Sequence, residues 1–118
     1  MFFFKKTVEE KIEKWVENRN AGKLIKMATT DNNHINRAKA YDALGRVRVK
    51  ECLETLLDCF KLDETDIVRH AAARGLAQLA SKKEFDAIQH FIDDETNPKV
   101  LEALKAALLE AKERTPRW

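Results

Sequence analysis

The feature that most constrains this chain is an internal repeat with a period of 32 residues. Residues 36–45 align over residues 68–77 without a gap, and a third copy follows at 100–109. A degenerate fourth copy precedes them near the N-terminus. The matched pairs of the first two copies include Arg37 with Arg69, Ala40 with Ala72, and Leu44 with Leu76. A repeat of this length is typical of supersecondary units that stack to bury a shared core.

Apolar residues within each unit recur at spacings of three and four, which place them on one face of a helix. Leu53, Leu56 and Phe60 show this spacing in one unit. A capping residue before a proline, as in Asn97-Pro98, is typical of a helix start, and Asp66 stands where another helix is expected to begin. The pattern predicts seven helices, over about 5–18, 21–29, 34–46, 49–61, 66–80, 83–92 and 97–113.

The composition agrees with an all-α chain. It has 118 residues, of which 44% are hydrophobic and 36% charged, with only three glycines. That is too apolar for intrinsic disorder and long enough for one domain with a core. We therefore expect a single domain over residues 1–118, built from units of about 1–30, 31–62, 63–94 and 95–118.

Residues 63–76 read DETDIVRHAAARGL and carry a family resemblance. Val68-Arg69 is followed by a pair of alanines and then by a small residue before Leu76, and Asp63 lies six residues before the arginine. This pattern resembles the HEAT repeat in its bacterial form. The resemblance implies a short right-handed α-solenoid of helical hairpins, with about seven helices in three and a half repeats.

The resemblance also implies a structural role for two acid and arginine pairs. Asp31 with Arg37 and Asp63 with Arg69 have the same spacing in consecutive units, and they look like a charged ladder that links the units. In the last unit, Glu95 and Leu101 stand at the acidic and arginine positions, so we expect the pairing to be lost there.

Residues with catalytic or metal-binding chemistry are few and show no motif. Cys52 and Cys59 are seven apart in one expected helix, so their Cα atoms are about 10.5 Å apart, which is too far for a disulfide. They lie beside the apolar stripe and are expected to be buried packing thiols. No metal-ligand spacing connects them with the three histidines. We expect a non-enzymatic protein with no catalytic residue, no metal site and no cofactor.

The exposed side of the second helix of each hairpin lines the concave face and binds ligands in proteins of this resemblance. Here the charges on that side change sign along the chain, and residues 63–94 carry four Lys and Arg against seven Asp and Glu. A groove with an acidic stretch argues against nucleic acid and favours a protein or peptide partner, although solvated surface remains the alternative. The predicted binding residues are Arg19, Lys23, Lys26, Glu51, Glu54, Asp58, Lys83, Asp86 and His90.

The C-terminal helix is a second candidate surface, because no partner helix is expected to cover its apolar edge. The edge comprises Leu101, Leu108, Leu109 and Trp118, and it is available for a partner or for a homodimer. Phe2, Phe3 and Trp118, at the chain termini, either fold back over the open ends of the stack or are available to a partner. The remaining aromatic residues, Trp15, Phe60, Phe85 and Phe91, are expected to pack in the core.

The leading hypothesis is a cytoplasmic protein–protein interaction module. The apolar stretch at the N-terminus has four residues, which is too short for a signal peptide, and charges interrupt every segment long enough for a membrane span. Two alternatives come from the family, because some HEAT-like proteins are DNA glycosylases and others are bilin lyases of the phycobilisome. The basic cluster that supports the first alternative comprises Arg37, Lys39, Arg46, Arg48 and Lys50.

Overall fold

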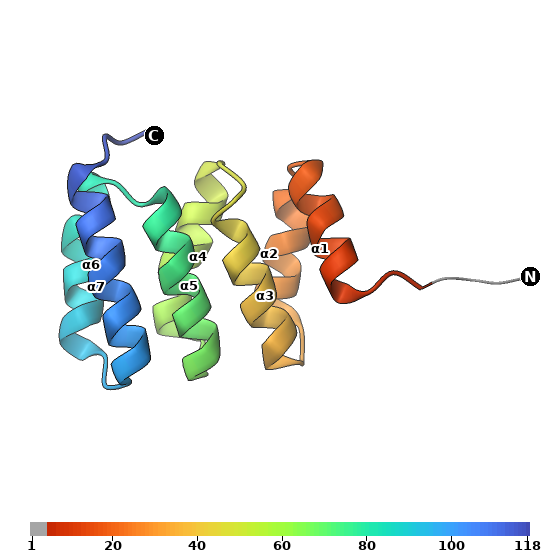
Figure 1. The fold of residues 1–118 in the computed structure, drawn as a ribbon, viewed down its shortest axis with the longest axis horizontal. Coiled ribbons are helices and arrows are strands. Elements are labelled where there is room, and N and C mark those ends of the chain that lie inside the picture. Colours follow the sequence, from red (N-terminus) through yellow and green to blue (C-terminus); the bar gives the residue numbers. More distant parts are fainter. Residues whose placement is uncertain (1–4) are drawn as a thin grey trace, which may run out of the picture.

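The computed structural model describes residues 5–118, which form seven α-helices and one short 3-10 helix (Figure 1). This confirms the all-α class, and the helix bounds differ from the predicted ones by three residues at most. The helices are α1 (Val8–Glu17), α2 (Ala21–Thr30), α3 (His34–Leu44), α4 (Lys50–Leu62), α5 (Asp66–Leu79), α6 (Phe85–Asp94) and α7 (Pro98–Glu113), with the 3-10 helix η1 (Lys82–Glu84) before α6.

The helices form two layers. The first helices of the hairpins, α1, α3, α5 and α7, lie side by side in front in Figure 1, and the second helices, α2, α4 and α6, lie behind them. The molecule measures 54 × 30 × 18 Å, and its shortest dimension corresponds to two packed helices of about 10 Å each. This is the solenoid-like arrangement that the repeat predicts.

Helix starts follow the capping chemistry of the sequence. Helix α1 begins at Val8 because the Thr7 hydroxyl accepts a hydrogen bond from the backbone N–H of Glu10 at 3.1 Å. The Asn97 side chain caps α7 in the same way, as predicted. Helix α5 begins at Asp66, as predicted, although the Thr65 side chain at the cap position makes no capping hydrogen bond.

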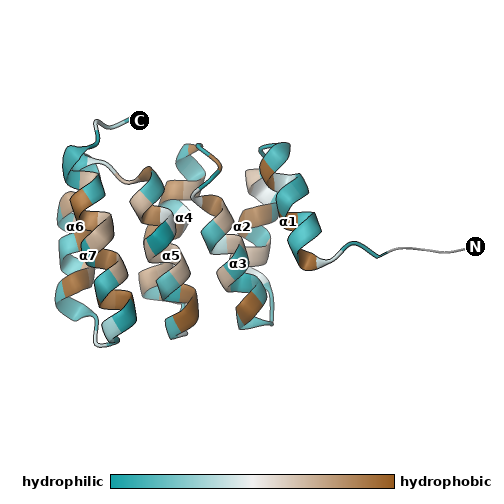
Figure 2. Cartoon of the chain, viewed as in Figure 1, coloured by the Kyte–Doolittle hydropathy of each residue, from teal (hydrophilic) through white to brown (hydrophobic). Residues whose placement is uncertain are grey.

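Small residues let the first helices approach one another closely. A Cβ atom added to Gly45, after α3, would lie 2.8 Å from the Cα of Gly75 in α5. A Cβ at Gly75 would lie 2.5 Å from a methyl of the buried Leu56. Ala43 and Ala107, which share the repeat position of Gly75, are fully buried. Figure 2 shows that each helix carries both apolar and polar residues, as expected for elements that bury one side.

The charged ladder exists, but its pairs differ from those predicted. Arg37 donates a hydrogen bond to the carboxylate of Asp63 at 2.9 Å. Its hydrogen bond with Asp31 goes to the backbone carbonyl oxygen and not to the carboxylate. Arg69 donates to Glu95 through two nitrogens, at 3.0 and 3.1 Å. Each arginine therefore reaches the acid of the following unit.

The expected loss of the pairing at the last unit is wrong for the same reason. Glu95 lies at the start of that unit and is the acceptor for the arginine of the unit before it, Arg69. It therefore needs no arginine at the position of Leu101. The spacing between acid and arginine within one unit does not identify the ion-pair partner, because each arginine side chain extends toward the next unit of the stack.

Candidate functional site

The nine charged residues predicted on the second-helix face are all exposed. Lys23 and Lys26 lie on α2, while Glu51, Glu54 and Asp58 lie on α4. The remaining four are Arg19 before α2, Lys83 in η1, and Asp86 and His90 on α6. The structure thus presents these side chains to solvent, and their role in binding stays a prediction.

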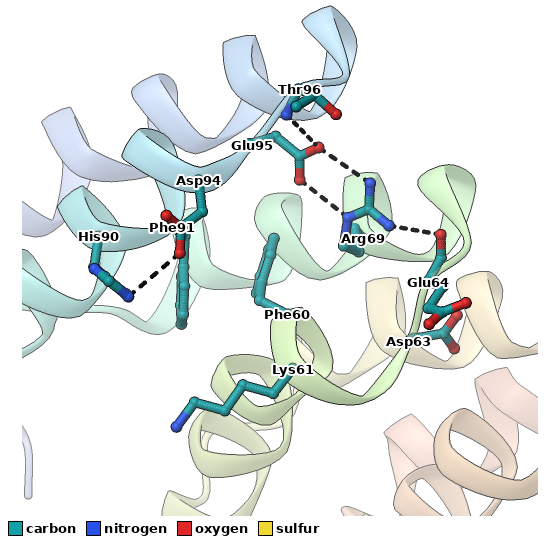
Figure 3. Close-up of a pocket in the computed structure, with 10 residues that line it drawn as sticks. All are labelled: Phe60, Lys61, Asp63, Glu64, Arg69, His90, Phe91, Asp94, Glu95 and Thr96. Carbon is teal, nitrogen blue, oxygen red and sulfur yellow. Dashed lines mark hydrogen bonds and ion pairs between the residues drawn. The ribbon is translucent and has the colours of Figure 1, made fainter.

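A pocket of about 320 Å³ opens between the C-terminal ends of α4 and α6 (Figure 3). Phe60 of α4 and Phe91 of α6 project toward each other in it, with ring centroids 4.6 Å apart and planes inclined by 16°. The other lining residues are Lys61, Asp63, Glu64, Arg69, His90, Asp94, Glu95 and Thr96. The pocket therefore combines a stacked aromatic pair with a charged rim.

The two pocket aromatics are half-buried, so the prediction that they pack in the core describes only part of their role. One period after Phe60 is Ile92, and Phe91 precedes that position by one residue. One residue on a helix corresponds to a rotation of about 100°. The one-residue offset of Phe91 from the repeat position of Ile92 is the feature of the sequence that could have indicated a different orientation, toward a neighbouring helix.

The charged ladder forms one wall of the pocket. Burial raises the pKa of Glu95, but hydrogen bonds from Arg69 and from the Asn97 backbone outweigh this effect and hold that pKa below its ordinary value. Burial likewise raises the pKa of Asp63, and hydrogen bonds from Arg37 and Thr65 more than compensate, so the net shift is downward. Both carboxylates are therefore ionised and tied to their arginines at neutral pH.

The outer rim of the pocket is exposed. The carboxylates of Glu64 and Asp94 lie at the surface, and the His90 Nε2 atom is 3.3 Å from Asp94. Arg69 also donates to the backbone carbonyl of Glu64, which ties the rim to the ladder. An open pocket with these groups is suited to holding a side chain of another molecule.

Trp118 lies against α4 and η1, not on α7 as the predicted apolar edge requires. It lines a second cavity, of about 180 Å³, together with Leu53 and Leu79. Its backbone oxygen accepts a hydrogen bond from the Lys83 ammonium at 3.1 Å. The chain after α7 therefore folds back, which is the first of the two alternatives for Trp118, and Trp118 does not contribute to an apolar edge on α7.

The leucines of the predicted edge differ in exposure. Leu101 and Leu108 are half-buried, and Leu108 packs against the core. Leu109 is 68% exposed. Phe2 and Phe3, the terminal residues at the other end, lie outside the described residues.

The family model described as HEAT repeats matches residues 21–109, which is more than half of the chain. This chain belongs to the HEAT-repeat family. No curated protein and no solved structure matched it. HEAT repeats commonly mediate protein–protein interactions and generally serve as non-enzymatic scaffolds.

The thiols of this HEAT-repeat protein are buried, as predicted. Cys52 and Cys59 are fully inaccessible, and burial raises their pKa values to about 11 and about 12. Both thiols are therefore protonated at neutral pH and act as packing groups. Across residues 5–118 there is no group of three or more side chains that could hold a metal ion. No helix in that span is long and apolar enough to cross a membrane.

The basic cluster of the sequence is largely neutralised by carboxylates in the HEAT-repeat fold. Arg37 belongs to the ladder, Lys39 pairs with Glu9, and Arg46 pairs with Glu13 at 2.7 Å. The Lys50 ammonium lies 3.9 Å from Glu54. Four of the five cations therefore have carboxylate partners on different elements or faces, and Arg48 alone enters no ion pair among the described residues.

Proposed function

We propose that this HEAT-repeat protein is a non-enzymatic interaction module of the cytoplasm that binds a protein or peptide through its second-helix face. The observation that carries the proposal is the pocket between α4 and α6. Aromatic side chains that are partly exposed within a pocket and surrounded by charges are typical centres of protein interfaces. Phe60 and Phe91 have this arrangement.

The ladder supports the proposal because it orders the pocket in the absence of a partner. Arg69 and Glu95 form two hydrogen bonds, and Arg69 also binds the backbone of Glu64 on the opposite side of the rim. A pre-organised pocket loses little conformational entropy on binding. The exposed charges along α2, α4 and α6 surround this centre and would select the partner by complementarity.

The proposal is tested by affinity capture from a lysate of the source organism, with and without nuclease. Phe91→Ala removes one ring of the stacked pair and is expected to abolish capture of the specific partner. Phe85→Ala is the matched control, because Phe85 is also half-buried on α6 but lies outside the pocket. Equal capture by the Phe91→Ala variant and by the wild type would refute the pocket as the binding centre.

The charged rim of the face is tested separately from the aromatic pair. Glu51→Lys combined with Asp58→Lys reverses two exposed carboxylates of α4 without removing any packed side chain. The variant is expected to stay folded and to lose the partner. If binding to every captured protein persisted, the α4 part of the face would play no role.

The nuclease treatment addresses the nucleic-acid alternative. Recovery that disappears after nuclease treatment would favour binding of nucleic acid over binding of a protein. The lyase-type alternative rests on resemblance of the repeat alone, and a shared fold does not carry an activity.

The exposure of the Leu109 side chain favours a second function, which is self-association through α7. This side chain is 68% exposed on a helix that ends the stack. We propose that a second copy covers it, and light scattering tests this. A mass that rises above 13.6 kDa with concentration and returns to it in the Leu109→Glu variant is expected. A mass that stays at the monomer value at all concentrations would exclude the dimer.

A further inference from the structure

The connections between helices separate charge to opposite edges of the molecule. Figure 1 shows that the connections within hairpins and the C-terminal segment lie along one edge, and the connections between hairpins lie along the other. We name these the upper edge (residues 18–20, 45–49, 80–84 and 114–118) and the lower edge (residues 31–33, 63–65 and 95–97).

The upper edge carries seven Lys and Arg residues, two of which (Arg46 and Arg114) pair with Glu13 and Glu110 of adjoining helices, and one carboxylate. That carboxylate, Glu84, is buried and accepts hydrogen bonds from the backbone and hydroxyl of Ser81. The lower edge carries four carboxylates and no Lys or Arg, and two of these carboxylates, Asp63 and Glu95, pair with the arginines of the adjoining helices. The alternation of charge along the sequence thus becomes a separation of charge in space.

Arg19 on the upper edge adopts a backbone conformation that favours glycine. Its φ of 53° is the only positive value at a non-glycine residue in the described part of the chain. It follows α1 at a position that glycine commonly takes, where any other side chain is strained. Its guanidinium donates to the backbone carbonyl of Arg48 at 3.2 Å, which holds the Arg19 side chain against the connection after α3. Strain of this kind points to a use for the side chain that the fold does not require.

The cavity of about 180 Å³ opens at the same edge. Lys50, Lys83 and Arg117 line it together with two carboxylate residues, Glu54 and Glu84, and the buried Leu53 and Leu79 form its apolar wall. Glu54 lies 3.9 Å from the Lys50 ammonium, and Glu84 is bonded to Ser81. The volume suits a single side chain of another molecule. Three cations against two carboxylates leave the lining with an excess of positive charge, and an apolar wall beside that charge favours an occupant that combines a short aliphatic stem with a carboxylate.

We propose that the upper edge is a second interaction surface, which binds an acidic segment of a partner protein and receives one of its Glu or Asp side chains in this cavity. Exposed carboxylates at adjoining helix ends, including Glu17, Glu51 and Glu113, interrupt the positive surface. A continuous phosphate backbone would meet these groups, whereas the discrete carboxylates of a protein segment fit between them. The surface is distinct from the pocket between α4 and α6, and the proposal does not depend on that pocket.

The first test measures binding of fluorescein-labelled hexaglutamate by anisotropy at low ionic strength. Arg48→Glu combined with Arg117→Glu reverses two upper-edge cations, and we expect affinity to fall by about tenfold or more. Lys11→Glu combined with Lys105→Glu is the control, since it makes the same change in net charge away from the upper edge and away from both cavities. None of these four side chains enters an ion pair among residues 5–118. An equal loss in both variants, or no binding by the wild type, would overturn the proposal.

The second test separates binding from folding at a single residue. Arg19→Gly relieves the backbone strain, so the melting temperature is expected to stay the same or rise, while the affinity for hexaglutamate falls by about threefold. Weaker binding by a protein of equal or higher stability supports a binding role for the side chain. Unchanged affinity would overturn that role.

A third comparison distinguishes the class of partner. A single-stranded oligonucleotide of equal charge replaces hexaglutamate in the same assay. We expect weaker binding of the oligonucleotide, because the interspersed carboxylates repel a continuous polyanion. Tighter binding of the oligonucleotide would overturn the proposal in favour of nucleic acid.

Discussion

Arg37 and Asp63 form an ion pair at 2.9 Å although 26 residues separate them, and the pair joins the start of α3 to the connection before α5. The same relationship recurs between Arg69 and Glu95 at 3.0 Å. Each pair crosses from one unit to the next, so the ladder acts as a series of clamps between neighbouring repeats. The second clamp also forms a wall of the aromatic pocket, which connects the stability of the stack to the candidate site.

Removing one partner of the second clamp is expected to destabilise the stack. Arg69→Met leaves the Glu95 carboxylate, which is 6% exposed, without its guanidinium. An uncompensated charge of this kind costs about 3 kcal/mol. Urea unfolding followed by circular dichroism measures the change. The double variant with Glu95→Gln should recover part of the loss, and a single variant as stable as the wild type would show that the clamp contributes nothing.

The two clamps predict a loss of stability in acid. The pKa values of Asp63 and Glu95 are lower in the folded state than their ordinary values of 3.8 and 4.5. Their contribution is complete above the ordinary values and declines as pH falls below them, because the unfolded chain binds protons first. Unfolding free energies measured over this range should decrease with falling pH. The Arg69→Met variant should show a weaker dependence, and an identical slope would contradict the assignment.

Close approach of α3 and α5 predicts opposite outcomes for two glycine substitutions. Gly45→Ala would place a methyl 2.8 Å from the backbone of Gly75, and we expect a destabilisation of about 1–3 kcal/mol from overpacking. Gly22→Ala, in α2, meets only Asn20 at 3.7 Å and should stabilise the helix by about 0.5–1 kcal/mol. Thermal unfolding of both variants gives the comparison. Two shifts of the same sign would argue against the close contact.

Burial of the thiols predicts that they are unreactive in the folded protein. The pKa values of Cys52 and Cys59 are raised to about 11 and about 12, and neither side chain is accessible. Modification by a disulfide reagent near pH 8 should therefore be slow and should follow global unfolding. A urea series with spectrophotometric detection measures the rate. Rapid labelling of one thiol in native buffer would reveal local opening around it.

The periodic pattern of the sequence determined the elements of this protein and their order. Leu24, Leu56 and Ile88 recur at the period of 32 residues, and all three are fully buried on successive second helices. The starts of α1 and α7 follow from the capping side chains of Thr7 and Asn97, which act within a few residues. These features depend on local geometry and on which side of a helix is apolar, and both can be read from spacing.

Only the tertiary structure decided which side chains meet across units. The partner of Arg69 is Glu95 and not Asp63, Phe91 faces Phe60, and Trp118 lies against α4. Each of these contacts depends on the distance and rotation between helices that are remote in sequence. The separation of charge to two edges has the same origin, because reversal of chain direction at each connection brings every second loop to the same side. Spacing along the chain specifies the face of a helix, whereas packing specifies the neighbour that the face meets.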